Sequence, residues 1–193
     1  MTLDEIAINH KTDKSTKYQG YTLIYPLYLD RYKDKNFKLL EIGVQEGKSL
    51  RMWHDYFPNA ELFGIDLRLP WRSHVKTISR IFVGNQEDRV FLKEVGDEVG
   101  PFEVIIDDGG HTMNQQITSF EVLWPYIKEE GLYIIEDLDT SYREEFGGGL
   151  RKAGTTVEYM KNKLDAVVMK SERKITDIKY MHFYEELLFI GKK

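Results

Sequence analysis

The sequence predicts an α/β fold, with a mostly parallel seven-stranded sheet flanked by helices and an antiparallel hairpin at its C-terminal end. Short apolar runs alternate with amphipathic stretches along most of the chain, which is typical of such a sheet. The last two apolar runs are separated by too few residues for a right-handed crossover, so they should pair as a hairpin. The 193 residues contain no internal repeat or low-complexity linker. This length favours a single domain, residues 1–193.

The elements follow in order from these patterns. Residues 1–35, rich in Lys and Tyr, are expected to form a helical segment laid over the site. Pro58 and Asn59 end the first helix after a strand, and residues 102–107 are apolar enough to be covered on both faces. The expected strands are 38–43, 61–66, 79–83, 102–107, 131–136, 175–183 and 187–190, and the expected helices are 49–57, 89–94, 113–127 and 156–168.

Composition excludes several classes of function. The chain has no cysteine, which excludes a disulfide scaffold, a thiol nucleophile, an iron–sulfur cluster and a Cys-type zinc site. With 27 Lys+Arg against 32 Asp+Glu the net charge is −5, which argues against nucleic acid as a partner. No run approaches the ~20 apolar residues of a membrane span, and the N-terminus lacks the pattern of a secretory signal. We therefore expect a cytoplasmic protein without membrane association.

A glycine-containing turn follows the first strand. Gly43 to Ser49 is not a P-loop, because three residues rather than four separate the first glycine from Gly-Lys-Ser, and no Gly-x-Gly-x-x-Gly is present. Asp66 ends the second strand, where an acid accepts hydrogen bonds from ribose hydroxyls. A ribose-bearing ligand without pyrophosphate fits these groups, and S-adenosylmethionine matches that description. The candidate cofactor-binding residues are Glu41, Gly43, Gly47, Ser49, Asp66, Gln86, Asp88 and Asp107, with Gln86 or Asp88 expected at the adenine.

Acidic residues also gather at the ends of two later strands. Asp108, Glu136 and Asp137 should converge there, and unpaired carboxylates in one place indicate a bound cation. Oxygen ligands favour Mg²⁺, with Ca²⁺ or Mn²⁺ possible, whereas acids that only cap the following helices are the alternative. His111 follows a Gly-Gly turn and is a candidate general base, because its ordinary pKa of ~6.5 suits proton transfer near neutrality. A histidine that only caps the next helix is the alternative here.

Four segments together resemble a known family. They are Leu-Leu-Glu-Ile-Gly-Val-Gln-Glu-Gly-Lys-Ser (39–49), Gly-Ile-Asp (64–66), Ile-Ile-Asp-Asp-Gly-Gly-His (105–111) and Ile-Ile-Glu-Asp-Leu-Asp-Thr-Ser-Tyr (134–142). In this order they resemble the metal-dependent class I methyltransferases that modify sugar hydroxyls, including the macrolide and aminocoumarin sugar O-methyltransferases. The cephalosporin hydroxylase group has a similar site. Thr12-Asp13-Lys14 with Tyr21 resembles the family's N-terminal motif, which lies close to the cofactor.

The resemblance implies a Rossmann-like class I methyltransferase fold, with S-adenosylmethionine and Mg²⁺ as cofactors. It implies Asp108, Glu136 and Asp137 as metal ligands and His111, or a site carboxylate such as Asp108, as the catalytic base. Two departures concern the substrate side of the site. Residues 17–19 stand where a histidine is common, and Asp139 stands where a histidine often follows the acid pair.

We expect from this an S-adenosylmethionine-dependent, Mg-dependent O-methyltransferase acting on a hydroxyl of a sugar or a glycosylated natural product. The alternatives are a catechol-type enzyme acting on an aromatic diol, a metal-dependent hydroxylase, and a non-catalytic S-adenosylmethionine-binding protein. The partner would be a small-molecule or saccharide acceptor, and a homodimer is possible. Residues 146–154, with three consecutive glycines, form either a lid over the acceptor or an ordinary connector.

Overall fold

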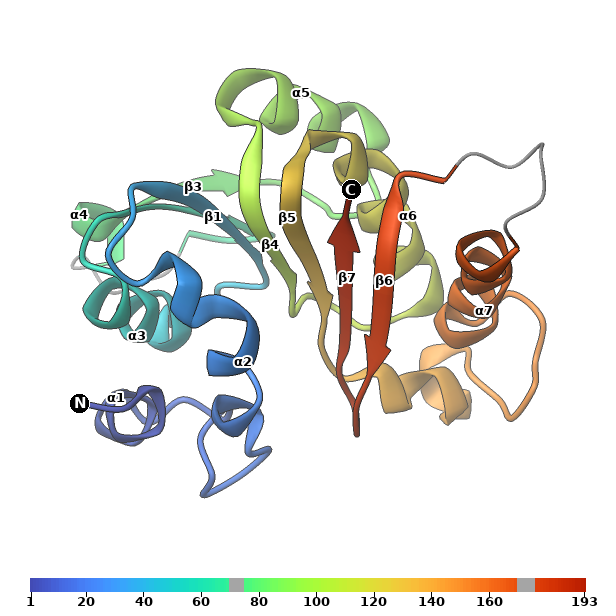
Figure 1. Ribbon diagram of the computed structural model, residues 1–193, viewed down its shortest axis with the longest axis horizontal. Coiled ribbons are helices and arrows are strands. Elements are labelled where there is room, and N and C mark those ends of the chain that lie inside the picture. Colours follow the sequence, from blue (N-terminus) through green and yellow to red (C-terminus); the bar gives the residue numbers. More distant parts are fainter. Residues whose placement is uncertain (70–74, 170–175) are drawn as a thin grey trace. The chain divides into compact units, whose positions relative to one another are not determined.

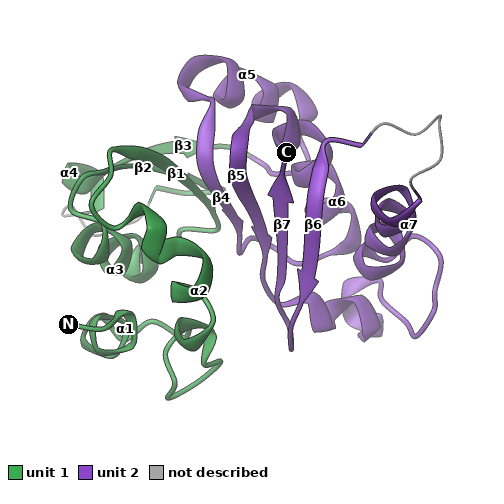
Figure 2. Cartoon of the chain, in the orientation of Figure 1, with its two compact units in different colours: residues 1–84 green, residues 85–193 purple. Residues whose placement is uncertain are grey.

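The computed structural model describes residues 1–69, 75–169 and 176–193. The chain divides into two compact units, residues 1–84 and residues 85–193 (Figure 2). Each unit has its own strands and helices and is described by itself below. The expectation that residues 1–193 act as a single domain stays a prediction.

The first unit contains three parallel strands, β1 (Phe37–Ile42), β2 (Ala60–Asp66) and β3 (Ser79–Val83), in the order β3-β2-β1. All three lie where the sequence predicts strands. In β1 five of the six side chains are buried, as expected for a strand covered on both faces. Helix α3 (Lys48–Tyr56) packs against β2 and against the short helix α4 (Val75–Ile78). Gly64 of β2 permits the close approach of the turn after β1, because a Cβ there would lie 2.6 Å from Val44 Cγ2.

Four short helices precede β1, as the sequence predicts. They are α1 (Leu3–His10), η1 (Tyr21–Leu23), α2 (Pro26–Leu29) and η2 (Asp30–Tyr32). Helix α1 packs on α3, and His10 Nε2 lies 2.7 Å from Asp55 Oδ2 across that contact. The rings of Tyr25 and Trp53, both without solvent exposure, meet edge to face at 5.2 Å. The segment therefore completes the core of the first unit, and its expected position over the catalytic site stays a prediction.

The second unit contains β4 (Phe102–Asp107), β5 (Ile127–Ile135), β6 (Ile178–Phe183) and β7 (Leu188–Lys192), in the order β4-β5-β7-β6 (Figure 1). The pair β4–β5 is parallel, and the pairs β5–β7 and β7–β6 are antiparallel. The predicted C-terminal hairpin is therefore confirmed. The expected start of its first strand, residue 175, lies outside the described residues.

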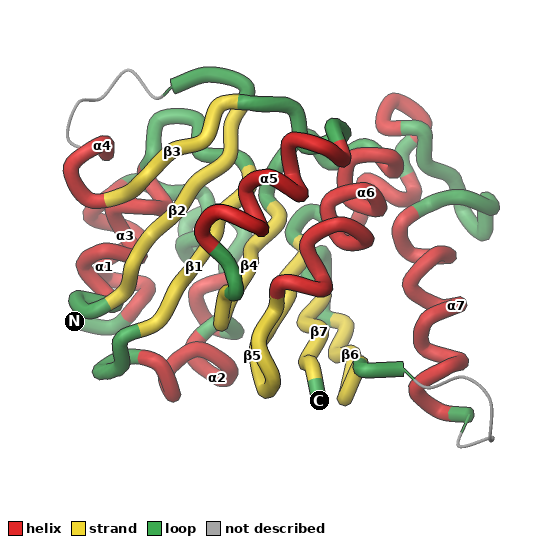
Figure 3. Tube along the Cα trace, turned by 90° about the horizontal axis from the view of Figure 1, so that it is seen from above, coloured by secondary structure: helices red, strands yellow, loops and turns green. Residues whose placement is uncertain are grey.

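The helices of the second unit are α5 (Arg89–Val99), α6 (Met113–Leu123) and α7 (Thr156–Val168), with the 3-10 turn η3 (Trp124–Tyr126). Helices α5 and α6 pack alongside each other (Figure 3), and α7 has the predicted bounds. The expectation that α6 reaches residue 127 is wrong, because Pro125 cannot donate the backbone bond that would continue the helix. Strand β5 accordingly begins at Ile127, before the expected residue 131.

The segment after β5 folds back on itself. It forms η4 (Leu138–Tyr142) and η5 (Glu144–Phe146), and then the three glycines at 147–149. The amide of Gly148 donates to Arg143 O at 2.8 Å, and the amide of Gly149 donates to Ser141 O at 2.9 Å. A Cβ on Gly148 would lie 2.4 Å from the carbonyl oxygen of Thr140, so the turn depends on glycine at that position. Residues 147–149 are thus held against η4, and movement of 146–154 as a lid stays a prediction.

Candidate active site

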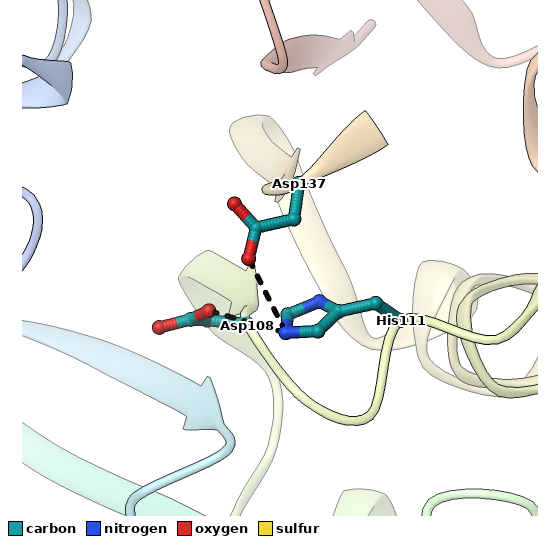
Figure 4. A group of neighbouring side chains, drawn as sticks. All are labelled: Asp108, His111 and Asp137. Atoms are coloured by element: carbon teal, nitrogen blue, oxygen red, sulfur yellow. Dashed lines mark ion pairs between the residues drawn. The ribbon is translucent and has the colours of Figure 1, made fainter. Parts of the chain in front are cut away.

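Two carboxylates and one imidazole meet in the second unit. Asp108 and His111 lie in the loop after β4, and Asp137 lies in the loop after β5 (Figure 4). The Nε2 atom of His111 lies 3.3 Å from Asp137 Oδ2 and 4.0 Å from Asp108 Oδ1. One ligand atom from each of the three lies within 4.8 Å of the others. The predicted meeting of the two strand ends therefore occurs, and it brings the predicted base in among the acids.

The backbone at this group is held in an unusual conformation. His111 has φ 60° and Asp137 has φ 51°, both in the left-handed region that residues other than glycine seldom occupy. Each such residue costs on the order of 1–3 kcal/mol and persists only where the surroundings fix it. The carbonyl oxygen of Asp137 accepts bonds from the Thr140 amide at 3.2 Å and the Thr140 hydroxyl at 2.7 Å, which fixes the turn after β5.

The donor set fits a hard divalent cation. Carboxylate oxygens are the preferred ligands of Mg²⁺, and a mixed oxygen and imidazole set also suits Mn²⁺. The three side chains are about one-fifth exposed, so they are accessible without being fully hydrated. Among the described residues Nδ1 of His111 is buried and has no hydrogen-bond partner, so Nε2 is the nitrogen that faces the acids. Asp108 and Asp137 could therefore hold a cation next to the imidazole of His111, which could accept a proton.

Glu136, the third predicted metal ligand, is not a member of the group that the structure brings together among its described residues. It is completely buried. Its amide donates to Asp107 O at 3.0 Å, and its carbonyl oxygen accepts from Gln116 Nε2 at 3.0 Å. Its backbone therefore ties the end of β5 to β4 and α6, and a role for its carboxylate in metal binding stays a prediction.

Asp107, predicted to bind the cofactor, lies completely buried at the end of β4. Burial raises the pKa of its carboxyl to about 7, although hydrogen bonds from Tyr133, the Gly109 amide, Ser119 and Gln86 act in the opposite direction. The hydroxyl of Tyr133 donates to Asp107 Oδ2 at 3.2 Å. Through these contacts Asp107 helps to fix the loop that carries Asp108 and His111.

The predicted glycine turn lies in the first unit and is built around Asp66. One oxygen of that carboxylate, Oδ2, accepts hydrogen bonds from the amides of Val44 and Gln45, each at 2.8 Å. Gly43 and Gly47 have φ 90° and 69°, which glycine adopts without strain. Asp66 therefore fixes the conformation of the turn, in addition to any contact with a ribose.

Two other predicted cofactor residues of the first unit bond to each other. Glu41 is completely buried, and its Oε2 accepts from the Ser49 hydroxyl at 2.8 Å. The indole nitrogen of Trp53 approaches Glu41 Oε1 at 3.4 Å. The pair links the end of β1 to the first turn of α3, and a direct contact with a cofactor stays a prediction for both residues.

Gln86 and Asp88, predicted at the adenine, both make contacts within the second unit. Asp88 is the N-cap of α5, and its Oδ1 accepts from the amides of Val90 and Phe91 at 3.0 and 3.1 Å. Gln86 is buried and bonds to Asp107, Ser119 and the Gly110 amide. Sequence reasoning missed this role of Gln86, since nothing in its neighbourhood along the chain indicates a contact with residues 107–119.

Two further features beside the group were also missed. Thr112 and Gln115 form a capping box at the start of α6, which the pattern Thr-x-x-Gln could have indicated. The ring of Phe146 lies near His111, with ring centres 6.5 Å apart at 66°. Phe146 therefore contributes an apolar surface beside the candidate base.

Comparisons with known proteins agree with the fold. A sequence model described as a methyltransferase domain matches residues 40–138. L-olivosyl-oleandolide 3-O-methyltransferase of Streptomyces antibioticus is 38% identical over 176 residues, 86% of this chain and 45% of the relative. A tetracenomycin-C 3'-O-methyltransferase of Streptomyces olivaceus, specific by name for the 8-demethyl-8-(2-methoxy-alpha-L-rhamnosyl) compound, is 35% identical, covering 84% of this chain and 44% of the relative.

A solved structure resembles the chain over its whole length. It is the mycinamycin-pathway methyltransferase MycE in complex with Mg, S-adenosylhomocysteine (SAH) and mycinamycin VI, with a TM-score of 0.90 and 32% identity, covering 100% of this chain and 54% of that one. The predicted fold class is confirmed. The chain spans about half the length of the curated relatives that it matches. In the described part of the chain, no helix combines the length and apolarity needed to cross a membrane.

Proposed function

The chain belongs to the methyltransferase-domain family, and on that premise we propose that it is an S-adenosylmethionine-dependent, metal-dependent O-methyltransferase of EC class 2.1.1. The observation that carries the proposal is the meeting of Asp108, His111 and Asp137 at the loops after β4 and β5. A methyltransferase that acts on an unactivated hydroxyl needs a way to remove its proton, and two carboxylates beside an imidazole provide the means.

The acceptor that we propose is a sugar hydroxyl on a glycosylated small molecule. The two relatives described above are named for methyl transfer to sugar-bearing oleandolide and tetracenomycin compounds, and the solved structure contains mycinamycin VI. The half-buried ring of Phe146 beside His111 would suit the apolar part of such an acceptor. A homodimer and a cytoplasmic location, both expected from the sequence, stay predictions.

Each group of the site would have a separate task. Asp108 and Asp137 would hold the cation, with Glu136 as the third ligand expected from the family resemblance. When bound, Mg²⁺ supplies the positive charge that lowers the pKa of an acceptor hydroxyl, and S-adenosylmethionine supplies the methyl group. His111 would accept the hydroxyl proton at Nε2, which is the ring nitrogen beside both carboxylates. In the first unit, Gly43, Gly47 and Asp66 would bind S-adenosylmethionine.

The hydroxylase alternative is less well supported by the donor set. Non-haem iron oxygenases use two histidines and one carboxylate, whereas the group among the described residues has one histidine and two carboxylates. The catechol-type alternative would use the same groups. Only the acceptor, an aromatic diol in place of a sugar hydroxyl, therefore distinguishes this alternative from the proposal.

The direct test is transfer of a labelled methyl group from S-adenosylmethionine to a panel of glycosylated macrolides, glycosylated aromatic polyketides and simple catechols. We expect transfer to a glycosylated compound, loss of transfer with EDTA, and recovery when Mg²⁺ is added back. His111→Ala should lower turnover by about 10²–10⁴-fold, the usual contribution of general base catalysis. Transfer only to catechols would reject the sugar acceptor, and full activity in EDTA would reject the metal.

A further inference from the structure

The side chain of Gln86 spans the loop that carries two members of the candidate site. Its Oε1 accepts a hydrogen bond from the Gly110 amide at 2.7 Å. Its Nε2 donates to Asp107 Oδ1 at 3.2 Å and to Ser119 Oγ at 3.1 Å. A primary amide has two N–H donors, so these two bonds use both of them. The amide therefore joins the first and the last residue of the turn 107–110 and anchors that turn to α6.

The two glycines of this turn have amide side chains pressed against them. A Cβ on Gly109 would lie 2.0 Å from Gln86 Oε1, and a Cβ on Gly110 would lie 2.3 Å from Gln115 Oε1. Gln115 is itself held by its hydrogen bonds with Thr112 at the start of α6. The Gly-Gly pair is thus enclosed between one amide from the loop before α5 and another from α6. Glycine at both positions permits this close approach.

The enclosed turn determines where the site residues lie. Asp108 is inside it, and His111, with its left-handed φ of 60°, follows it directly. Neither residue is held by a helix or a strand, since β4 ends at Asp107 and α6 begins at Met113. The contacts of the loop backbone with its surroundings must therefore fix both side chains relative to Asp137. The Gly110 amide bond to Gln86 is the last such contact before His111.

We infer that Gln86 is a positioning residue, which fixes the turn 107–110 so that Asp108 and His111 meet Asp137. This role differs from the adenine contact expected for Gln86 from the sequence, because both N–H donors of its side-chain amide bond to Asp107 and Ser119 of the second unit. It rests on the proposed function only in the claim that the Asp108–His111–Asp137 group binds a cation. The bonds of Gln86 to Asp107, Gly110 and Ser119, which we call the clamp, do not depend on that claim.

The first experiment measures the clamp without metal or substrate. Gln86→Met keeps a side chain of similar length and removes both the acceptor and the donors. We expect hydrogen–deuterium exchange of the Gly110 amide, followed by NMR in the full chain, to become at least about tenfold faster, since an amide exchanges when its bond is broken. Asn114→Ala is the matched control, because it removes another amide side chain, bonded to Glu87 Oε1 at 2.8 Å on the neighbouring surface.

The second experiment measures the consequence for the site with Mn²⁺ as the probe, counted as free ion by electron paramagnetic resonance. Groups that orient metal ligands change the affinity by about 10–100-fold when they are removed, and Gln86→Met should weaken Mn²⁺ binding in that range. Asn114→Ala should bind Mn²⁺ as the unmodified chain does. Gln86→Ala removes the same acceptor and donors as Gln86→Met, so it should weaken Mn²⁺ binding in the same range.

A double substitution distinguishes the clamp from general loosening of the loop. Gly109→Ala should weaken Mn²⁺ binding because its methyl group collides with Gln86 Oε1. In Gln86→Ala the side chain that the methyl group would meet is absent. Adding Gly109→Ala to Gln86→Ala should therefore reduce the Mn²⁺ affinity less than Gly109→Ala reduces it in the unmodified chain. Equal reductions in the two backgrounds would contradict the positioning role of Gln86. The cycle needs only folded protein and a metal titration.

Three outcomes would overturn the inference. The first is a Gly110 amide that stays protected in Gln86→Met, and the second is Mn²⁺ affinity unchanged in that variant. The third is a loss of S-adenosylmethionine affinity with the Gly110 amide still protected, which would return Gln86 to the adenine. If the unmodified chain binds no Mn²⁺, the proposed metal site fails, and the exchange of Gly110 still decides whether the clamp exists. If Gln86→Met does not fold, Gln86→Ala, which also removes the acceptor and both donors, takes its place in both experiments.

Discussion

Replacing Gly47 with alanine should destabilise the first unit through two separate effects. Gly47 has φ 69°, and an L-residue in the left-handed region costs about 1–2 kcal/mol. The new Cβ would also lie 2.4 and 2.8 Å from the two γ-methyl groups of Val75, which is completely buried. Overpacking of this kind costs about 1–3 kcal/mol. The expected loss in the free energy of unfolding is therefore about 2–5 kcal/mol.

Val75→Ala separates the two effects, because it removes both γ-methyl groups and leaves the backbone conformation at position 47 unchanged. Urea unfolding of the parent chain, both single variants and the double variant gives a complete thermodynamic cycle. We expect Gly47→Ala to cost about 1–3 kcal/mol less in the Val75→Ala background, which is the overpacking part. If the losses in free energy of unfolding from Gly47→Ala and Val75→Ala simply add in the double variant, the proposed collision is refuted. If Gly47→Ala lowers the free energy of unfolding by less than about 1 kcal/mol in either background, the backbone strain is refuted.

Three further predictions concern other contacts. Asp66→Ala should weaken binding of S-adenosylmethionine by at least about tenfold, because charged hydrogen bonds contribute ~1.5–3 kcal/mol. An unchanged affinity, measured by calorimetry, would show that Asp66 neither fixes the turn for binding nor contacts the ribose. Thr112→Ala should lower the free energy of unfolding by about 1 kcal/mol through loss of an N-cap, measured in urea, and no change would show that the capping box contributes nothing. Burial opposes ionisation of Asp4, but hydrogen bonds from Thr16 and Thr22 outweigh it and lower the pKa of Asp4 below its usual value of 3.8. A carboxyl group with a lowered pKa stabilises the fold above pH 3.8. The difference in the free energy of unfolding between the parent chain and Asp4→Asn should therefore shrink as the pH falls below that value. A difference that grows instead would show that the pKa of Asp4 is raised by folding.

The parallel strands and the hairpin could be predicted because their signals are local. A run such as Phe102 to Asp107 is apolar over a strand's length, and every strand of the structure overlaps a predicted one. The start of β5 could not be predicted, since residues 128–130 are charged and exposed and continue no apolar pattern. A register shift between Phe102 and Val104 in the β4–β5 pair accompanies this part of the strand.

The candidate site was partly predictable for a similar reason. Parallel strands end at one edge, so Asp108, Asp137 and His111 were expected near each other from sequence order alone. The different surroundings of Glu136 and Asp137 were not predictable, because the left-handed φ of Asp137 depends on the turn after β5. The contacts of Gln86 with residues 107, 110 and 119 join segments more than 20 positions apart. Only the folded chain brings those atoms together.

The carboxylate of Asp66 has a thermodynamic consequence for ligand binding. Since it already fixes the amides of Val44 and Gln45, the turn in the first unit is ordered before any ligand arrives. Ordering a loop on binding reduces affinity, because the backbone entropy of each residue must be lost at that moment. Here that loss occurs during folding. A ligand that contacts the turn would meet a rigid surface, and its association would not wait for the loop to rearrange.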